Sequence, residues 1–176
     1  MMLTAHGPYY INLNAKEQDK IDSSIERIVL TAKTASMCGA NSITFHAAYY
    51  MKDDPRDVYD MVSRHLIEVE EQLRSNHLQI LIRPEITGRN SQFGTLEELV
   101  KLTNAHEFVA PCLDFGQLHA RNKECNDYDS FMRVIEYNEN EIKDPKRKWV
   151  HIHVSGVEYN SKGEVKKVNL AESPFN

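Results

Sequence analysis

Residues 79–85, Gln-Ile-Leu-Ile-Arg-Pro-Glu, form a short apolar run that ends in a carboxylate, Glu85. The run is too brief for a helix, so the pattern predicts a buried β-strand. Similar runs lie at residues 3–6, 42–46, 108–114 and 149–154. Each run carries a histidine or an acid at or just before its carboxyl end. The sequence therefore predicts five similar strands with polar side chains at their ends.

Amphipathic helices separate these strands. Apolar residues from Ile25 to Ala35 recur at helical spacing, and Gly39 stops that pattern. Thr95 with Glu98 three residues later is the signature of a capping box. The four expected helices begin after Asp22-Ser23, at Asp54-Pro55, at Thr95 and at Asp127 or Asp129.

Apolar strands that alternate with helices belong to a parallel sheet with covered faces, so the fold class is α/β. The chain has 176 residues, of which 41% are hydrophobic, and this is enough for the core of one domain. We expect a single domain over residues 1–176.

Charge and cysteine content restrict the classes of function. The formal net charge of -5 argues against a protein that coats nucleic acid by bulk charge, although a locally basic cleft stays open. Cys38, Cys112 and Cys125 have no close Cys-x-x-Cys spacing and are expected to be reduced thiols. No apolar run approaches a membrane span, and the first residues lack a signal-peptide pattern. We expect a cytoplasmic protein with no membrane partner.

The residues at the strand ends predict a metal site. Side chains at the carboxyl ends of neighbouring parallel strands converge on one mouth of the sheet. Imidazoles and carboxylates together bind a divalent metal, and Zn²⁺, Mn²⁺ and Fe²⁺ all accept this mixture. The five expected ligands are His6, His46, Glu85, Asp114 and His153.

Two carboxylates also permit two metals, because a carboxylate can bridge two cations. Such a centre activates water for phosphodiester hydrolysis, and it can equally hold the vicinal oxygens of a sugar during an isomerisation. The ligand types alone do not choose between these reactions.

The sequence motifs around these ligands resemble those of the endonuclease IV family of apurinic/apyrimidinic endonucleases, within the xylose-isomerase-like TIM-barrel superfamily. The resemblance covers nearly the whole chain. The matching motifs are residues 6–13 (HGPYYINL), 45–46 (FH), 84–88 (PEITG), 112–116 (CLDFG), 118–121 (LHAR) and 151–158 (HIHVSGVE).

The resemblance implies that His6, His46 and Glu85 hold one zinc, and that Glu85 bridges to a second zinc held by Asp114 and His153. The family's third zinc would use Glu164, but Gln117 and Lys167 stand where two of its histidines would align. A protonated lysine repels a metal, so two zinc sites are expected and the third lacks ligands. We consider His119 as a replacement for Gln117. For His151 and His153 we expect opposite faces of the strand, with only His153 at the metals.

The resemblance also implies a TIM-barrel-type fold that is incomplete. A full barrel needs roughly 200 to 250 residues, and the similarity includes about five of the eight strands, without the first two and the last βα units. Such an arc would expose two strand edges and one side of a barrel core. We therefore expect a partner chain or self-association to complete the barrel.

Other residues in or near the matching motifs are expected to contact DNA. Tyr9 and Tyr10 occupy the place of bulky side chains that wedge into the minor groove at a lesion. Arg89 and Arg121 lie in loops on the same mouth as the metal ligands and could contact phosphates, as could Gln92 and Lys52.

The leading hypothesis is a metal-dependent DNA-repair endonuclease that cuts duplex DNA on the 5′ side of an abasic site, with Glu85 and Asp114 as its catalytic carboxylates. One alternative is a divalent-metal sugar isomerase or epimerase. Another is a barrel fragment that binds damaged DNA or a partner chain without cutting it.

Overall fold

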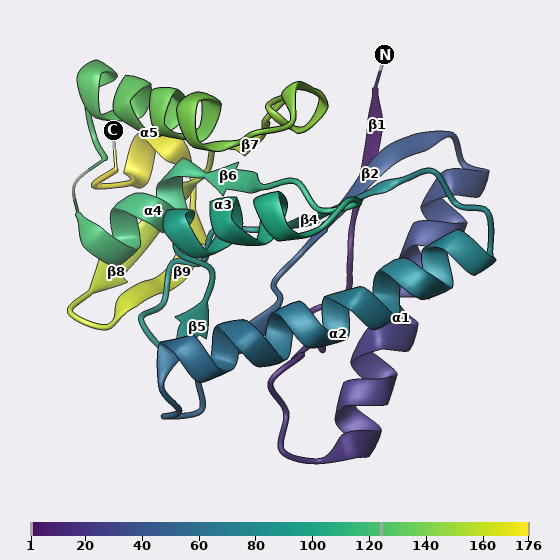
Figure 1. Cartoon of the computed structure of the whole chain (residues 1–176). Coiled ribbons are helices and arrows are strands. Elements are labelled where there is room, and N and C mark those ends of the chain that lie inside the picture. Colours follow the sequence, from purple (N-terminus) through teal and green to yellow (C-terminus); the bar gives the residue numbers. More distant parts are fainter. Residues whose placement is uncertain (1, 124, 176) are drawn as a thin grey trace.

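Five parallel strands form a curved sheet in the computed structural model, which describes residues 2–123 and 125–175 (Figure 1). β1 (Leu3–His6), β2 (Ala40–Phe45) and β4 (Leu81–Pro84) pair in that order, and β6 (Cys112–Asp114) pairs with β7 (His151–His153). Parallel bridges from Ile82 to Val109 and from Glu85 to Cys112 join the two parts. The predicted set of five parallel strands is confirmed.

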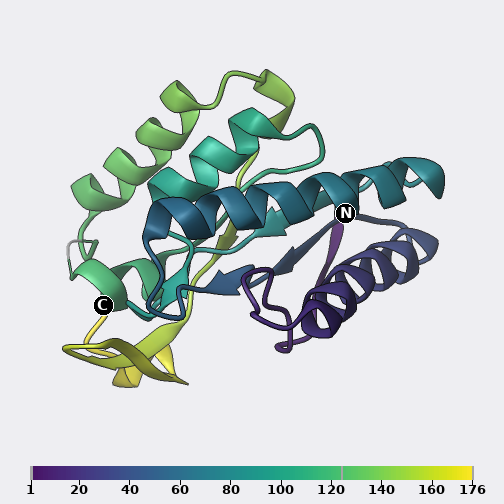
Figure 2. The ribbon, with the colours of Figure 1, turned by 60° about the horizontal axis from the view of Figure 1, so that its bottom comes forward.

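The helices lie on the outer side of this arc, as the two ribbon views show (Figures 1 and 2). They are α1 (Gln18–Met37), α2 (Pro55–Ser75), α3 (Leu96–Ala105), α4 (Phe115–Asn122) and α5 (Tyr128–Glu141). The hydrophobic core fills the space between the strands and these helices. Ile43, Phe45 and Ile82 of the strands are fully buried, as are Ile28 of α1 and Leu66 of α2.

The inner, concave face of the arc is polar. Side chains alternate between the two faces of a strand, and the residues opposite to the core positions are Thr4, Ser42, Thr44, Arg83 and His151. The arc does have an accessible inner side, which is lined by Thr4, Ser42, Leu81, Arg83 and His151 among others. The core lies outside the arc, which explains how five strands can form a stable layer with their helices.

The structure corrects several expected element boundaries. The first helix begins at Gln18 rather than after Asp22-Ser23, and its N-cap, Glu17, makes no side-chain cap bond that would mark the start in the sequence. The expected strand over residues 108–114 is regular only from Cys112, since Pro111 has no N–H for the ladder.

Three further features were not predicted. One is the fifth helix, α4. The others are two antiparallel pairs, formed by β3 (Ala48–Tyr49) with β5 (Gln92–Phe93) and by β8 (Gly156–Asn160) with β9 (Gly163–Val168). Short 3₁₀ turns lie at Pro145–Arg147 and Leu170–Glu172.

The expected helix caps are confirmed. The Asp54 side chain accepts from Arg56 N with Pro55 in the first turn, and Thr95 and Glu98 form both bonds of a capping box. Of the two acids considered for the last helix, Asp127 is the cap. Among the described helices, none combines the length and apolar character needed to cross a membrane.

A buried carboxylate joins α2 to the end of α3. The Glu70 side chain is 6% exposed; it lies 3.3 Å from Nδ1 of His106 and accepts a 2.8 Å hydrogen bond from Phe108 N. Burial alone would raise the pKa of Glu70, but the bonds from His106 and Phe108 N hold it below its usual value. The ionised form is therefore the one that stabilises the fold.

We predict that Glu70→Ala lowers the free energy of unfolding by about 2–3 kcal/mol at pH 7, because it leaves buried donors without an acceptor. A carboxylate with a lowered pKa contributes above its unfolded pKa, and that contribution disappears as the pH falls through its folded pKa. The difference from the wild type should thus shrink in acid. Urea unfolding measures it, with Glu71→Ala at an exposed position of the same helix as the control. Equal losses in the two variants would contradict this role.

Candidate metal centre

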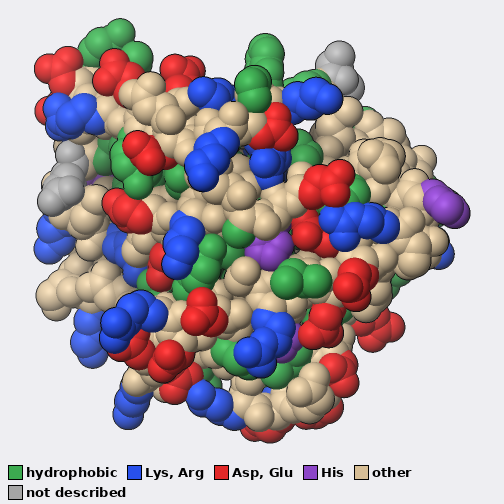
Figure 3. Space-filling model, in the orientation of Figure 1, with side chains coloured by type: hydrophobic (Ala, Val, Ile, Leu, Met, Phe, Trp, Pro, Cys, Tyr) green, Lys and Arg blue, Asp and Glu red, His purple; other side chains and the backbone are tan. Residues whose placement is uncertain are grey.

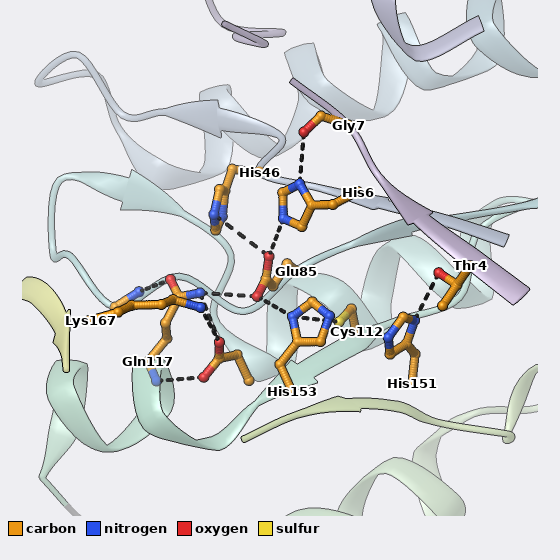
Figure 4. Close-up of polar contacts among 12 residues, drawn as sticks. Thr4, His6, Gly7, His46, Glu85, Cys112, Gln117, His151, His153 and Lys167 are labelled. Carbon is orange, nitrogen blue, oxygen red and sulfur yellow. Dashed lines mark hydrogen bonds and ion pairs between the residues drawn. The ribbon is translucent and has the colours of Figure 1, made fainter. Parts of the chain in front are cut away.

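The centre of the site is the Glu85 carboxylate, whose side chain is only 1% exposed. Its oxygen Oε2 lies 3.1 Å from Nε2 of His6 and 3.6 Å from Nε2 of His46, and Oε1 lies 2.7 Å from Nδ1 of His153. Three imidazoles therefore surround one buried carboxylate (Figure 4).

The strands explain this convergence. His6, Asp114 and His153 are the last residues of β1, β6 and β7, while His46 and Glu85 directly follow β2 and β4. The carboxyl ends of parallel strands meet at one edge of the sheet, so all five side chains reach the same volume. The structure thus brings together the five expected ligands, and their binding of a metal stays a prediction.

Hydrogen bonding prepares His6 as a ligand. Its Nδ1 donates to Gly7 O at 2.7 Å, which leaves the lone pair of Nε2 directed at the Glu85 carboxylate. Two lone-pair atoms this close require a shared cation, which is either a proton or a metal. Glu85 raises the pKa of His6, as expected when the proton takes that place.

Burial and neighbouring groups also shift the pKa values of Glu85 and His46. Burial alone would raise the pKa of Glu85, but hydrogen bonds from His153 and His6 hold it well below its usual range. Burial lowers the pKa of His46, so this imidazole is neutral and able to bind a metal. Its Nδ1 has no hydrogen-bond partner among the described residues.

The donor set fits a divalent metal. The ligand atoms of His6, His46 and Glu85 lie within 4.8 Å of one another, and so do those of Glu85, Asp114 and His153. Zinc binds such mixtures of imidazole nitrogen and carboxylate oxygen.

Asp114 differs from Glu85 because protein donors already occupy both its oxygens. Oδ1 accepts from Gln117 N at 2.9 Å, and Oδ2 accepts from Gln117 Nε2 and from Lys167 Nζ, both at 3.1 Å. The first bond caps α4. Sequence reasoning missed these contacts, although an acid three residues before a glutamine at the end of a strand is a helix-start signature.

The β8–β9 hairpin delivers two charged side chains to the site. Gly163 has φ +99°, which favours glycine, and it approaches Gly88 so closely that a Cβ would lie 2.1 Å from the Gly88 carbonyl oxygen. Glu164 N donates to that oxygen at 2.8 Å. Lys167 and Glu164 therefore line the same cavity of about 290 Å³ as His6, His46 and His153. Burial raises the pKa of Glu164.

The residues expected to contact DNA are two tyrosines, which are exposed, and two arginines, which bond to the protein backbone. Tyr9 and Tyr10 are 77% and 81% exposed, and the Tyr9 ring lies 5.9 Å from the His6 ring at the mouth of the site. Arg89 also lines the cavity, where its Nε donates to Glu164 O. Arg121 instead donates to the backbone carbonyls of residues 87, 89 and 92. It holds the loop that carries Arg89, and a phosphate contact by either arginine stays a prediction.

The structure answers one question about the histidines and corrects one expectation. His119, considered as a replacement for Gln117, does not serve as one, because its Nε2 lies 3.1 Å from the Tyr159 hydroxyl and its ring packs on Phe175. His151 and His153 do not point to opposite faces, because residues two apart in a strand share a face. Their ring centroids are 4.7 Å apart, and both can join Cys112 in a third group of ligand atoms.

The comparisons with known proteins agree with this fold. The chain belongs to the family of xylose isomerase-like TIM barrels, which it matches over residues 1–172. It is 39% identical over 177 residues to the uncharacterized protein MJ0133 of Methanocaldococcus jannaschii, covering all of this chain and 64% of that protein.

Solved structures show the same architecture. Endonuclease IV from Thermus thermophilus superposes with a TM-score of 0.72 at 18% identity, over 98% of this chain and 60% of that chain. A D-tagatose 3-epimerase-like protein reaches the same TM-score of 0.72 at 16% identity, over 99% of this chain and 62% of that chain. The chain thus spans about three fifths of the length of these relatives, in agreement with an incomplete barrel.

We predict that Glu85→Gln and His46→Gln each abolish tight zinc binding, because each removes a donor from the centre. Metal content after zinc loading and dialysis against a competing chelator measures this, with circular dichroism as the check on folding. His119→Gln is the matched control and should retain zinc, since His119 faces away from the centre. Wild-type zinc content in Glu85→Gln would disprove the assignment.

Proposed function

We propose that this chain carries the metal centre of a DNA-repair endonuclease that hydrolyses the phosphodiester on the 5′ side of an abasic site in duplex DNA. The observation that carries the proposal is the buried Glu85 carboxylate with three imidazoles around it, beside a polar cavity that Tyr9 lines, with the exposed Tyr10 next to it in the chain. The structural likeness to an endonuclease IV supports the choice of reaction.

The residues would divide the chemistry as follows. A divalent metal, when bound, supplies Lewis-acid activation of water and neutralises charge on the phosphoryl group. His6, His46 and Glu85 would hold it, and His153 would support Glu85 from its other oxygen, Oε1. Arg89 and Lys167 face the same cavity and place positive charge where the phosphate would lie.

The charge of the chain favours recognition of a lesion over general binding of DNA, because the formal net charge is -5. Acidic and basic side chains are interspersed on the face seen in Figure 3, which shows no broad basic field. Tyr9 and Tyr10 instead offer aromatic surface that can fill the gap left by a missing base.

We also propose that a partner chain or a second copy of this chain completes the barrel. β1 and β7 are the outermost strands of the described order, and Leu3 and Ile152 on them are 41% and 39% exposed. A partner chain or a second copy that pairs with these edges would cover both. Light scattering of the purified chain should then show a mass above that of one chain, whereas a stable monomer would contradict self-association.

A sugar isomerase or epimerase is the second candidate function. Lys167 and Gln117 occupy the oxygens of Asp114, which leaves a smaller centre beside a cavity of about 290 Å³. A cavity of that size suits a small ligand, and the epimerase-like neighbour superposes as well as the endonuclease does.

Incision of a labelled duplex with one abasic site separates these functions. We predict metal-dependent cleavage 5′ to the lesion, and we predict that Tyr10→Ala weakens binding of the abasic duplex by about tenfold through loss of aromatic stacking. Tyr128→Ala is the matched control, because Tyr128 is 76% exposed on α5, away from the site.

Two other outcomes would contradict the endonuclease, and a third would contradict the role of Tyr10 alone. Turnover of a free keto or aldo sugar without incision would establish the isomerase, whereas retention of abasic DNA without a product would indicate a binding protein. An equal loss of affinity in Tyr10→Ala and Tyr128→Ala would remove the lesion-wedge role of Tyr10.

A further inference from the structure

A lysine lies where a second cation of the centre would be expected. The Asp114 carboxylate is fully buried, and Lys167 reaches it from β9 with Nζ at 3.1 Å from Oδ2. Asp114 is therefore the buried half of an ion pair, and its charge is already balanced.

The Asp114 oxygen that faces Lys167 already has two donors. Lys167 Nζ and Gln117 Nε2 each lie 3.1 Å from Asp114 Oδ2. A metal ion that bound to Asp114 Oδ2 would have to displace this ammonium or lie directly against its positive charge. Both disturb the charge balance of the Asp114 carboxylate, which is fully buried although the Lys167 side chain is half exposed.

Gln117 occupies the space between the two carboxylates. Its Nε2 donates to Glu85 Oε1 at 3.0 Å and to Asp114 Oδ2 at 3.1 Å. Its Oε1 accepts from Gly88 N at 3.0 Å, so the backbone fixes which end of the amide faces the acids. The amide N–H groups thus join the two carboxylates, as a shared metal would otherwise do.

The opposite side of Glu85 has no such substitute. There the imidazoles of His6 and His46 face Oε2, and the hydrogen on His6 Nδ1 is directed away to Gly7 O. This side presents lone pairs, whereas the Asp114 side presents donors. The two halves of the cluster therefore prefer different cations.

We propose that the centre is a hybrid, in which one divalent metal binds beside Glu85, His6 and His46, and the Lys167 ammonium takes the place of a second metal at Asp114. This inference rests on the metal centre proposed above. It assigns Lys167 a function in the site: with one N–H directed at Asp114, its other N–H groups can bind an anionic oxygen of the substrate in the shared cavity.

Zinc stoichiometry tests the inference without recourse to activity. The full chain is dialysed against excess free zinc, and bound zinc is measured by mass spectrometry. We expect one zinc per wild-type chain and one in Lys167→Arg, which keeps the charge. We expect two in the double variant Gln117→His/Lys167→His, where two donors become ligands. Unfolding curves verify that each variant is folded.

One control removes a competing site. Cys112, His151 and His153 form a further group of ligand atoms within 4.8 Å, so every measurement is repeated in the Cys112→Ser background. Two zinc ions per wild-type chain in that background would overturn the inference, and so would a single zinc in the double histidine variant.

The remaining outcomes separate this inference from the proposed function. One zinc in a chain that does not cut abasic DNA would support the hybrid centre and contradict the endonuclease. No zinc in the wild-type chain would overturn the metal centre and this inference together.

Discussion

The burial of the Glu85 carboxylate is the constraint on which the rest of the site depends. An ionised acid with a 1% exposed side chain is tolerated only when cations or hydrogen-bond donors surround it. His6, His46 and His153 surround it on the strand edges, and Gln117 completes the shell. Four strand ends and one helix start are thereby arranged around a single pair of oxygens, in a donor set that a divalent metal could share.

The position of the core explains how the arc can support this site. The fully buried apolar residues lie between the outer face of the strands and α1 to α3, and the inner face carries polar side chains. Folding energy therefore comes from the outer layer, while the inner layer is left for chemistry. The β8–β9 hairpin, held to the loop after β4 through Gly163 and Gly88, then brings Lys167 and Glu164 over the metal ligands.

Local patterns in the sequence predicted much of this arrangement. The apolar runs with polar ends identified the five strands and their convergent side chains, and short-range cap signals at Asp54 and Thr95 identified the helix starts. Pairings between distant segments were not predictable in this way. The bond from Lys167 to Asp114 spans 53 residues. The turn residues Asn160 and Gly163 could have indicated the hairpin but not where it packs. The error at His151 came from the strand geometry assumed, because residues two apart share a face.

The central claim is that zinc binds beside Glu85 through imidazole and carboxylate donors. X-ray absorption of the zinc-loaded chain tests it most directly, because nitrogen and oxygen ligands scatter at about 2.0–2.2 Å and thiolate sulfur at about 2.3 Å. The account predicts a shell of nitrogen and oxygen with the multiple-scattering pattern of imidazoles. A sulfur shell would place the metal in the group of Cys112, His151 and His153 instead, and would contradict the account.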